Sequence, residues 1–172
     1  EGGASFMALG VSCTSKSIGT LMIVPAAGTT HAMSGIGEAF LDGIPMLIIT
    51  GGTRQDTGRH YQLHQLNQEN LVAEVTKAFF KIKSHNDIIP TIYKAYEIAI
   101  SGEPGPVFIE IPIELQMFKG EVDKMEAYTQ QFRNPTIDEH KIREAAKMLA
   151  QAKNPGIYVG WGAAGATEDT ER

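Results

Sequence analysis

Cysteine and charge are both scarce in this chain of 172 residues. Cys13 is the single cysteine, which excludes an internal disulfide and a cluster of thiolate metal ligands. This favours a reducing compartment, and we expect a cytoplasmic protein. The formal net charge is -5 and no basic run occurs, which argues against nucleic acid as the main partner. No apolar stretch reaches the ~18 residues that would cross a bilayer, so no membrane partner is expected.

The common short motifs of nucleotide binding and hydrolysis are also missing. Gly35-Ile36-Gly37 continues as Glu38-Ala39-Phe40, so the third small residue of a dinucleotide fingerprint is absent. The sequence has no Gly-Lys-Ser/Thr phosphate loop, no Gly-x-Ser-x-Gly elbow, no Cys/His dyad and no His/Glu metal spacing. We therefore predict no metal ligands in this chain, and its function must rest on less common patterns.

The clearest pattern lies near the start of the chain. Residues 21–24 form an apolar run short enough for a strand buried on both faces, which predicts a strand over residues 20–24. The run breaks at Pro25, and the small residues 26–30 follow, which let a backbone approach another group closely. A helical pattern covers residues 33–40, and residues 46–50 form a second apolar strand. This order predicts a βαβ unit with a ligand site at the carboxyl end of its first strand.

The alternation of strands and helices continues along the chain. Small residues favour a helix over residues 3–15, and further strands are predicted at 79–83 and 107–111. Asp87 is placed to cap a helix over residues 88–100. Strands that alternate with helices predict an α/β fold, with a parallel sheet flanked by helices.

The composition changes after residue 115. Residues 116–136 lose their apolar periodicity and are predicted to be an interdomain linker between a first domain, 1–115, and a second. In residues 137–172, an amphipathic helix over 138–151, a strand at 157–159 and a glycine-rich turn indicate the beginning of a second, central α/β domain.

Four segments carry a resemblance to a known family. They are Glu1-Gly2-Gly3-Ala4, the turn Ala26 to His31, the segment DGIPMLIITGG at 42–52 and the segment SGEPGPVFIEIP at 101–112. In this order they resemble the pyrimidine-binding domain of thiamine-diphosphate enzymes of the acetolactate synthase type. The resemblance covers nearly the whole chain, and the last two segments together are specific for it. It implies that the domain lacks its first strand and helix, and that the chain is an internal piece of a longer protein.

The resemblance assigns roles to individual residues. Glu1 matches the catalytic glutamate that hydrogen-bonds N1′ of the cofactor's aminopyrimidine and so promotes proton loss from C2 of the thiazolium ring. Residues that match the turn packed against the aminopyrimidine are Ala26, Gly28, Thr29 and His31. Two departures occur there, because Ala26-Ala27 replaces the usual Gly-Pro and His31 replaces Asn. The alternatives are that Glu1 is an ordinary charged surface residue and that His31 only satisfies backbone hydrogen-bonding groups at the start of a helix.

A polar loop supplies the candidates for substrate contact. His64 lies thirteen residues before Lys77, the spacing at which acetolactate-type enzymes place a substrate-facing Gln, and Gln65 is a weaker candidate beside it. An imidazole there could donate to a substrate carboxylate or carry a proton near neutral pH. A solvated loop histidine is the alternative.

The resemblance also implies the reaction class and the partners. It implies thiamine diphosphate and Mg²⁺, both held mainly by a domain outside this chain, and leaves FAD open. The full protein would be a transferase or lyase that makes or breaks a C–C bond beside the carbonyl of a 2-keto acid, as a homodimer or homotetramer. The isolated chain is expected to be inactive. Alternatives are a 2-hydroxyacyl-CoA lyase-like activity on an acyl-CoA-type substrate and a non-catalytic α/β binding module.

Overall fold

The computed structural model of the chain describes residues 1–123, 125, 127–129, 136–163 and 166. The chain divides into two compact units, Glu1–Phe132 and Arg133–Arg172. The predicted boundaries at 115, 136 and 137 stay predictions. Within the described residues, no helix has the length and apolar character needed to cross a membrane.

A four-stranded sheet forms the centre of the first unit. Its strands are β1 (Gly19–Ile23), β2 (Met46–Gly52), β3 (Ala78–Lys81) and β4 (Pro106–Pro112). They run in the order β1-β2-β4-β3, and every pair is parallel. The predicted parallel α/β sheet is therefore confirmed, with each predicted strand within two residues of its observed position.

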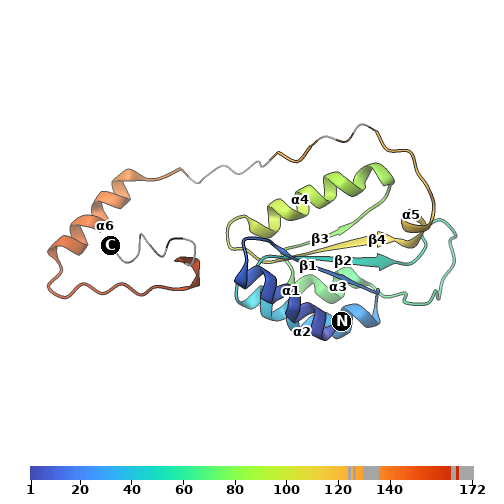
Figure 1. The fold of residues 1–172 in the computed structure, drawn as a ribbon, viewed down its shortest axis with the longest axis horizontal. Helices are drawn as coiled ribbons and strands as arrows, with labels where there is room; N and C mark the ends of the chain where they lie inside the picture. Colours follow the sequence, from blue (N-terminus) through green and yellow to red (C-terminus); the bar gives the residue numbers. More distant parts are fainter. Residues whose placement is uncertain (124, 126, 130–135, 164–165, 167–172) are drawn as a thin grey trace. The chain divides into compact units, whose positions relative to one another are not determined.

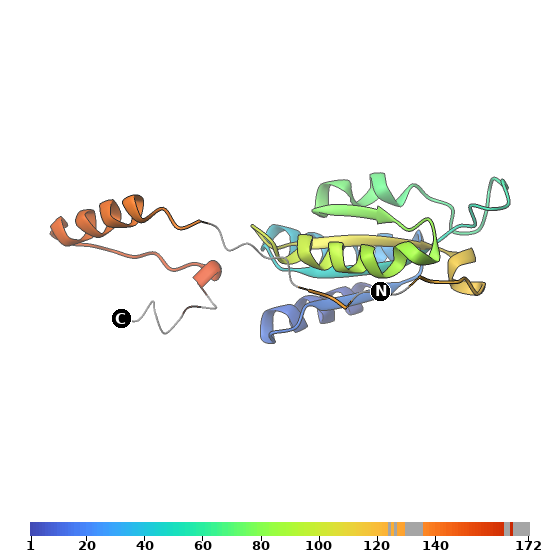
Figure 2. The ribbon, with the colours of Figure 1, turned by 90° about the horizontal axis from the view of Figure 1, so that it is seen from above.

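Helices cover both faces of this sheet (Figure 1). On one side lie α1 (Gly2–Thr14), α2 (Ala27–Leu41) and the short α3 (Gln68–Val72), which continues into a 3₁₀ turn, η1 (Ala73–Val75). On the other side lies α4 (Ile88–Ile100). A short helix, α5 (Ile113–Met117), follows β4. Figure 2 shows the same unit from above, with α4 lying over the sheet.

The alternation of side chains along β2 explains why both faces need a cover. Met46 and Ile48 belong to the core that contains α1 and α2, whereas Leu47 packs in the second core against Ala95 and Ala99 of α4. Successive residues of a strand point to opposite faces, so a continuous apolar run is stable only between two helical layers. This is the physical reason that the apolar runs predicted the sheet so closely.

The ends of α4 differ in part from the prediction. Asp87 occupies the N-cap position, but its side chain makes no cap hydrogen bond and instead accepts one from the hydroxyl of Ser84 at 2.7 Å. A 3₁₀ turn, η2 (His85–Asp87), leads into the helix. At the other end, Lys77 Nζ donates to the carbonyl of Ser101 at 2.6 Å and also to that of Ile98, and burial lowers the pKa of this lysine.

Part of the segment after α5 packs against α4. Asn86 Nδ2 donates to Asp123 Oδ2, and the backbone amide of Asp123 donates to Asn86 Oδ1, both at 2.9 Å. Tyr128 lies with its ring against those of Tyr93 and Tyr96. These contacts attach Asp123 and Tyr128 of the predicted linker to the rest of the first unit.

The second unit contains α6 (Glu139–Gln151), which confirms the predicted helix. The Asp138 side chain caps it by accepting hydrogen bonds from the amides of His140 and Lys141. The predicted strand at 157–159 is wrong, because these residues have no regular structure. A strand needs a neighbour to pair with, and the described residues of this unit include no strand. A 3₁₀ turn, η3 (Trp161–Ala163), occupies the start of the predicted glycine-rich turn.

Candidate functional site

A cleft of about 1060 Å³ opens at the carboxyl ends of β1, β2 and β4. Residues from all three strand ends line it, together with Glu1 at the start of α1 and His64 from the long loop after β2. Its floor is apolar and includes Ile49, Ile111 and Ile113. The carboxyl end of parallel strands is where open α/β sheets bind their ligands, so the fold puts the cleft where the sequence predicts a site.

The turn between β1 and α2 forms one wall of this cleft. Its backbone is strained, because Ala26 has φ 57° and ψ -91°, close to a rare γ-turn that costs free energy for any residue with a Cβ. The amide of Ala26 donates to Gln68 Oε1 at 3.1 Å, which helps to hold the turn in this shape. Strain of this kind is retained where the surrounding structure fixes it, and it often marks a binding site.

Glu1, Gly28 and His31 come together beside this turn. A Cβ added to Gly28 would lie 3.2 Å from both Cγ and Oε1 of Glu1, and 2.8 Å from Val24. The other carboxylate oxygen of Glu1, Oε2, is 3.7 Å from His31 Nδ1. The Glu1 side chain is 33% exposed and that of His31 is 71% exposed. The structure therefore places three of the predicted site residues together, with the Glu1 carboxylate packed over the buried Gly28.

Thr29 lies in the same turn but points elsewhere. Its side chain is fully buried, and its hydroxyl donates to Gln68 Oε1 at 2.7 Å. A group committed in this way is unavailable to a ligand in the cleft. The predicted contacts of Ala26 and Thr29 with a cofactor stay predictions, and what the structure shows is that both residues shape the turn around Gly28.

His64 lies in the long loop after β2, which also lines the cleft. This loop projects beyond the ends of β2 and β4 (Figure 2), and His64 itself has a positive φ of 63°. Gln62 organises the loop: its Oε1 accepts from the amide of Arg54, and its Nε2 donates to the carbonyls of Arg54 and Arg59. His64 and Glu1 thus line one cleft, as the prediction of a shared site requires.

Comparison with known proteins identifies the domain. Residues 1–71 match the family model described as "Thiamine pyrophosphate enzyme, N-terminal TPP binding domain". These residues belong to that family. They contain Glu1, the turn after β1 and His64, so the family match covers the cleft's principal side chains.

Curated relatives extend the similarity over nearly the whole chain. The large subunit of acetolactate synthase isozyme 1 from Escherichia coli is 30% identical over 94% of this chain and 29% of its own length. The acetolactate synthase large subunit of Haemophilus influenzae is 33% identical over 95% of this chain and 29% of its own length. The chloroplastic acetolactate synthase of Arabidopsis thaliana is 27% identical over 100% of this chain and 26% of its own length. The chain therefore spans less than a third of the length of these relatives.

The cleft combines a carboxylate with an apolar lining. Glu1 supplies the carboxylate, and Gly51 and Gly52 at the end of β2 line the cleft without side chains. Gly28 is buried beside it, and the absence of a side chain there leaves room for Val24 and Glu1. Among the described residues, no group of three or more His, Cys, Asp or Glu side chains could hold a metal ion. The cleft thus offers a ligand apolar contacts and one carboxylate that can accept a hydrogen bond.

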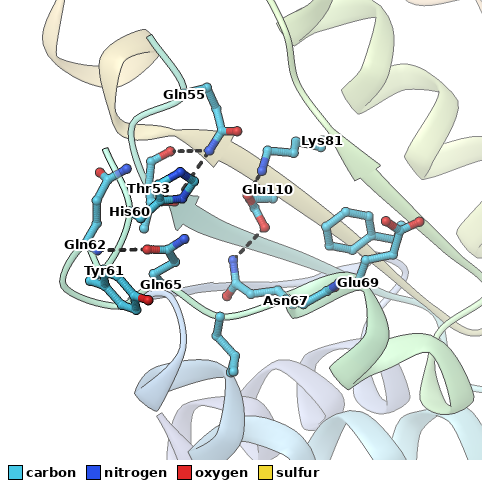
Figure 3. Close-up of a pocket in the computed structure, with 13 residues that line it drawn as sticks. Thr53, Gln55, His60, Tyr61, Gln62, Gln65, Asn67, Glu69, Lys81 and Glu110 are labelled. Carbon is cyan, nitrogen blue, oxygen red and sulfur yellow. Dashed lines mark hydrogen bonds and ion pairs between the residues drawn. The ribbon is translucent and has the colours of Figure 1, made fainter. Parts of the chain in front are cut away.

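A second, more polar hollow of about 920 Å³ lies on the other side of the loop (Figure 3). Gln65 lines this hollow and not the cleft of Glu1, and its Oε1 accepts from the amide of Gln62 at 2.8 Å. The predicted substrate contact of Gln65 stays a prediction, but the structure separates it from the Glu1 cleft. Figure 3 also shows Glu110 and Lys81 joined at the inner wall of this hollow.

Sequence reasoning missed two buried polar residues next to the site. Gln68 and Glu110 are 3% and 5% exposed and hydrogen-bond to each other at 2.8 Å. Glu110 did carry a signal, because it is the only charged residue in β4, where flanking positions are apolar. A buried carboxylate requires a partner. Gln68 gave no such signal, because it stands in a polar loop sequence.

Proposed function

We propose that this chain is the part of an acetolactate synthase-like, thiamine-diphosphate-dependent enzyme that binds the cofactor's aminopyrimidine ring in the cleft beside Glu1. The observation that carries this proposal is that the Glu1 carboxylate lines the cleft at the carboxyl end of a parallel sheet, where the absence of a side chain on Gly28 leaves room for it. The family match of residues 1–71 and the acetolactate synthase relatives support the reaction class. The proposed reaction makes or breaks a C–C bond next to the carbonyl of a small 2-keto acid.

Glu1 is the proposed proton-handling group. Its carboxylate would hydrogen-bond a ring nitrogen of the aminopyrimidine, and covering by the ring would remove the remaining exposed third of the side chain from water. Desolvation of a carboxylate raises its pKa and lets it share a proton with a ring nitrogen. Thiamine diphosphate, when bound, supplies the acidic C2–H of its thiazolium ring. Gly28 would leave room for the Glu1 carboxylate in this position, and His31 would lie beside that carboxylate.

The remaining cofactor contacts are assigned to parts of the protein outside this chain. The diphosphate and Mg²⁺ require an anion site and oxygen ligands, and we propose that another domain of the full-length protein supplies them. We propose a homodimer or homotetramer, in which that domain can come from a partner subunit. FAD stays an open possibility. A cytoplasmic location is likewise a proposal, since one relative is chloroplastic.

The comparisons favour this proposal over the two alternatives. The relatives described above are acetolactate synthases rather than 2-hydroxyacyl-CoA lyases. A non-catalytic binding module would have no need of a carboxylate against the ligand surface. Deuterium exchange at C2 of bound cofactor, compared between the full-length protein and variants of Glu1, distinguishes the enzyme from the module.

We expect His64→Ala to raise the KM for the 2-keto acid without slowing C2 exchange. His64 lines the same cleft as Glu1 but belongs to the loop after β2 and not to the turn beside Glu1, so its proposed partner is the substrate and not the pyrimidine. Loss of one charge-assisted hydrogen bond of about 1.5–3 kcal/mol predicts a roughly 10- to 10²-fold loss in kcat/KM. Steady-state kinetics and C2 exchange on the full-length protein measure the two effects. The control is His60→Ala, in the same loop outside this cleft, and equal losses in both variants would remove His64 from the site.

A further inference from the structure

A chain of buried hydrogen bonds runs from the turn of residues 25–29 to the far edge of the sheet. Thr29 Oγ1 and the amide of Ala26 donate to Gln68 Oε1, at 2.7 and 3.1 Å. Gln68 Nε2 donates in turn to Glu110 Oε2 at 2.8 Å and to the carbonyl of Gly51 at 3.1 Å. The other oxygen, Glu110 Oε1, pairs with Lys81 Nζ at 2.9 Å (Figure 3). The side-chain amide of Gln68, in α3, thus hydrogen-bonds to the turn, to β2 and to β4.

The amide of Gln68 has no hydrogen-bonding capacity left. A carboxamide offers two acceptor positions on its oxygen and two donor hydrogens on its nitrogen, and all four are used here. Rotation of the amide by 180° would set its hydrogens against the Thr29 and Ala26 donors, and its oxygen against a carboxylate. The orientation of Gln68 is therefore fixed by what surrounds it.

Glu110 is the anchor of this arrangement. Its side chain is 6% exposed and is held from both sides, by Lys81 on one oxygen and by Gln68 on the other. Glu110 occupies the space that a side chain at Gly52 would need, since a Cβ there would lie 2.6 Å from Glu110 Oε1. A buried carboxylate with both oxygens satisfied is a strong, directional acceptor, so it dictates which way the Gln68 amide points.

We propose that Glu110 is a positioning residue for the cofactor cleft, because it acts through Gln68 to hold the turn that sets Gly28 against Glu1. The inference rests on the proposed function. Glu110 itself faces the second hollow and not the cleft of Glu1. Its effect reaches the turn by way of the Ala26 amide and the Thr29 hydroxyl, which flank Gly28 on the chain. The strained φ of Ala26 is a conformation that needs such support.

A double-mutant cycle between Glu110→Gln and Thr29→Val in the full-length protein tests this link. An amide at 110 has one acceptor oxygen and cannot satisfy both Lys81 and Gln68, whereas valine removes the Thr29 hydroxyl at nearly constant volume. We expect each single variant to lower kcat by ~10- to 10²-fold through misplacement of the turn. The double variant should lose about as much as the worse single variant, because both changes break one connection. If the loss in kcat of the double variant equals the product of the two single losses, the two residues act independently and the proposal is overturned.

Two further readouts separate positioning from a general loss of stability. In cofactor-free protein, hydrogen exchange at the Ala26 amide should accelerate in Glu110→Gln, and wild-type protection there would also overturn the proposal. The matched control is Thr76→Val, which removes another buried hydroxyl hydrogen bond, to the carbonyl of Val72 at 2.9 Å. This control should leave kcat within about twofold and Ala26 exchange unchanged. Failure of the proposed function would give a different result. Glu1→Gln would then show normal C2 exchange, while the Ala26 amide would still exchange faster in Glu110→Gln.

Discussion

Replacement of Glu1 by glutamine in the full-length protein is expected to slow C2 deprotonation of bound thiamine diphosphate by ~10² to 10⁴-fold, the range typical of a lost acid–base group. Glutamine keeps the size of the side chain and can still hydrogen-bond a ring nitrogen. It cannot exchange a proton with that nitrogen. Because Gly28 and its turn are unchanged, the cofactor should bind with nearly the wild-type Kd.

Deuterium exchange at C2 and calorimetric titration with thiamine diphosphate and Mg²⁺ measure these two quantities. Glu38→Gln is a suitable control, since Glu38 lies on α2 and, unlike Glu1, does not line the cleft. It should leave both quantities unchanged. Wild-type C2 exchange in Glu1→Gln would mean that Glu1 is an ordinary surface residue and that the cleft has another role.

The sheet was predictable because its signals are local. Runs such as residues 46–49 are apolar at every position, and burial on both faces follows directly from that. The strand expected at 157–159 failed for the opposite reason. Its sequence is equally apolar, but a strand also needs a partner, and the described residues of the second unit supply none. Local pattern thus predicts a strand only where the fold provides its neighbours.

The residues of the site were more predictable than the hydrogen bonds between them. Glu1, Gly28 and His31 came from a resemblance, and the structure brings them together. The roles expected for Thr29 and Gln65 could not be judged from sequence, because they depend on where each side chain points. Contacts such as those of Gln68 with Ala26 and Glu110 each join residues 42 positions apart. No short-range pattern encodes a pairing over that distance.

The crossing of α1 and α2 yields the prediction with the largest expected effect on stability. A Cβ at Gly35 would lie 2.3 Å from Ser5 Oγ, 2.7 Å from Ser5 Cβ and 2.9 Å from its carbonyl carbon. Ser5 is fully buried, and its hydroxyl is tied to the carbonyl of Gly2 at 2.7 Å. Gly35→Ala should therefore lower the free energy of unfolding by about 1–3 kcal/mol, the usual cost of overpacking, which exceeds the gain in helix propensity of up to ~1 kcal/mol.

Thermal unfolding of the variant measures this loss, and Gly10→Ala is its matched control. Gly10 lies inside α1 with nothing within 4 Å of an added Cβ, so alanine there should stabilise the helix. Ser5→Gly added to Gly35→Ala should restore part of the loss, because it removes the two nearest atoms. Since the same helix crossing sets Glu1 against Gly28, Gly35→Ala should also slow C2 exchange, and the compensating change should recover some of it. Equal melting temperatures for Gly35→Ala and Gly10→Ala would show that the two helices can separate freely, and that their contact does not fix the position of Glu1.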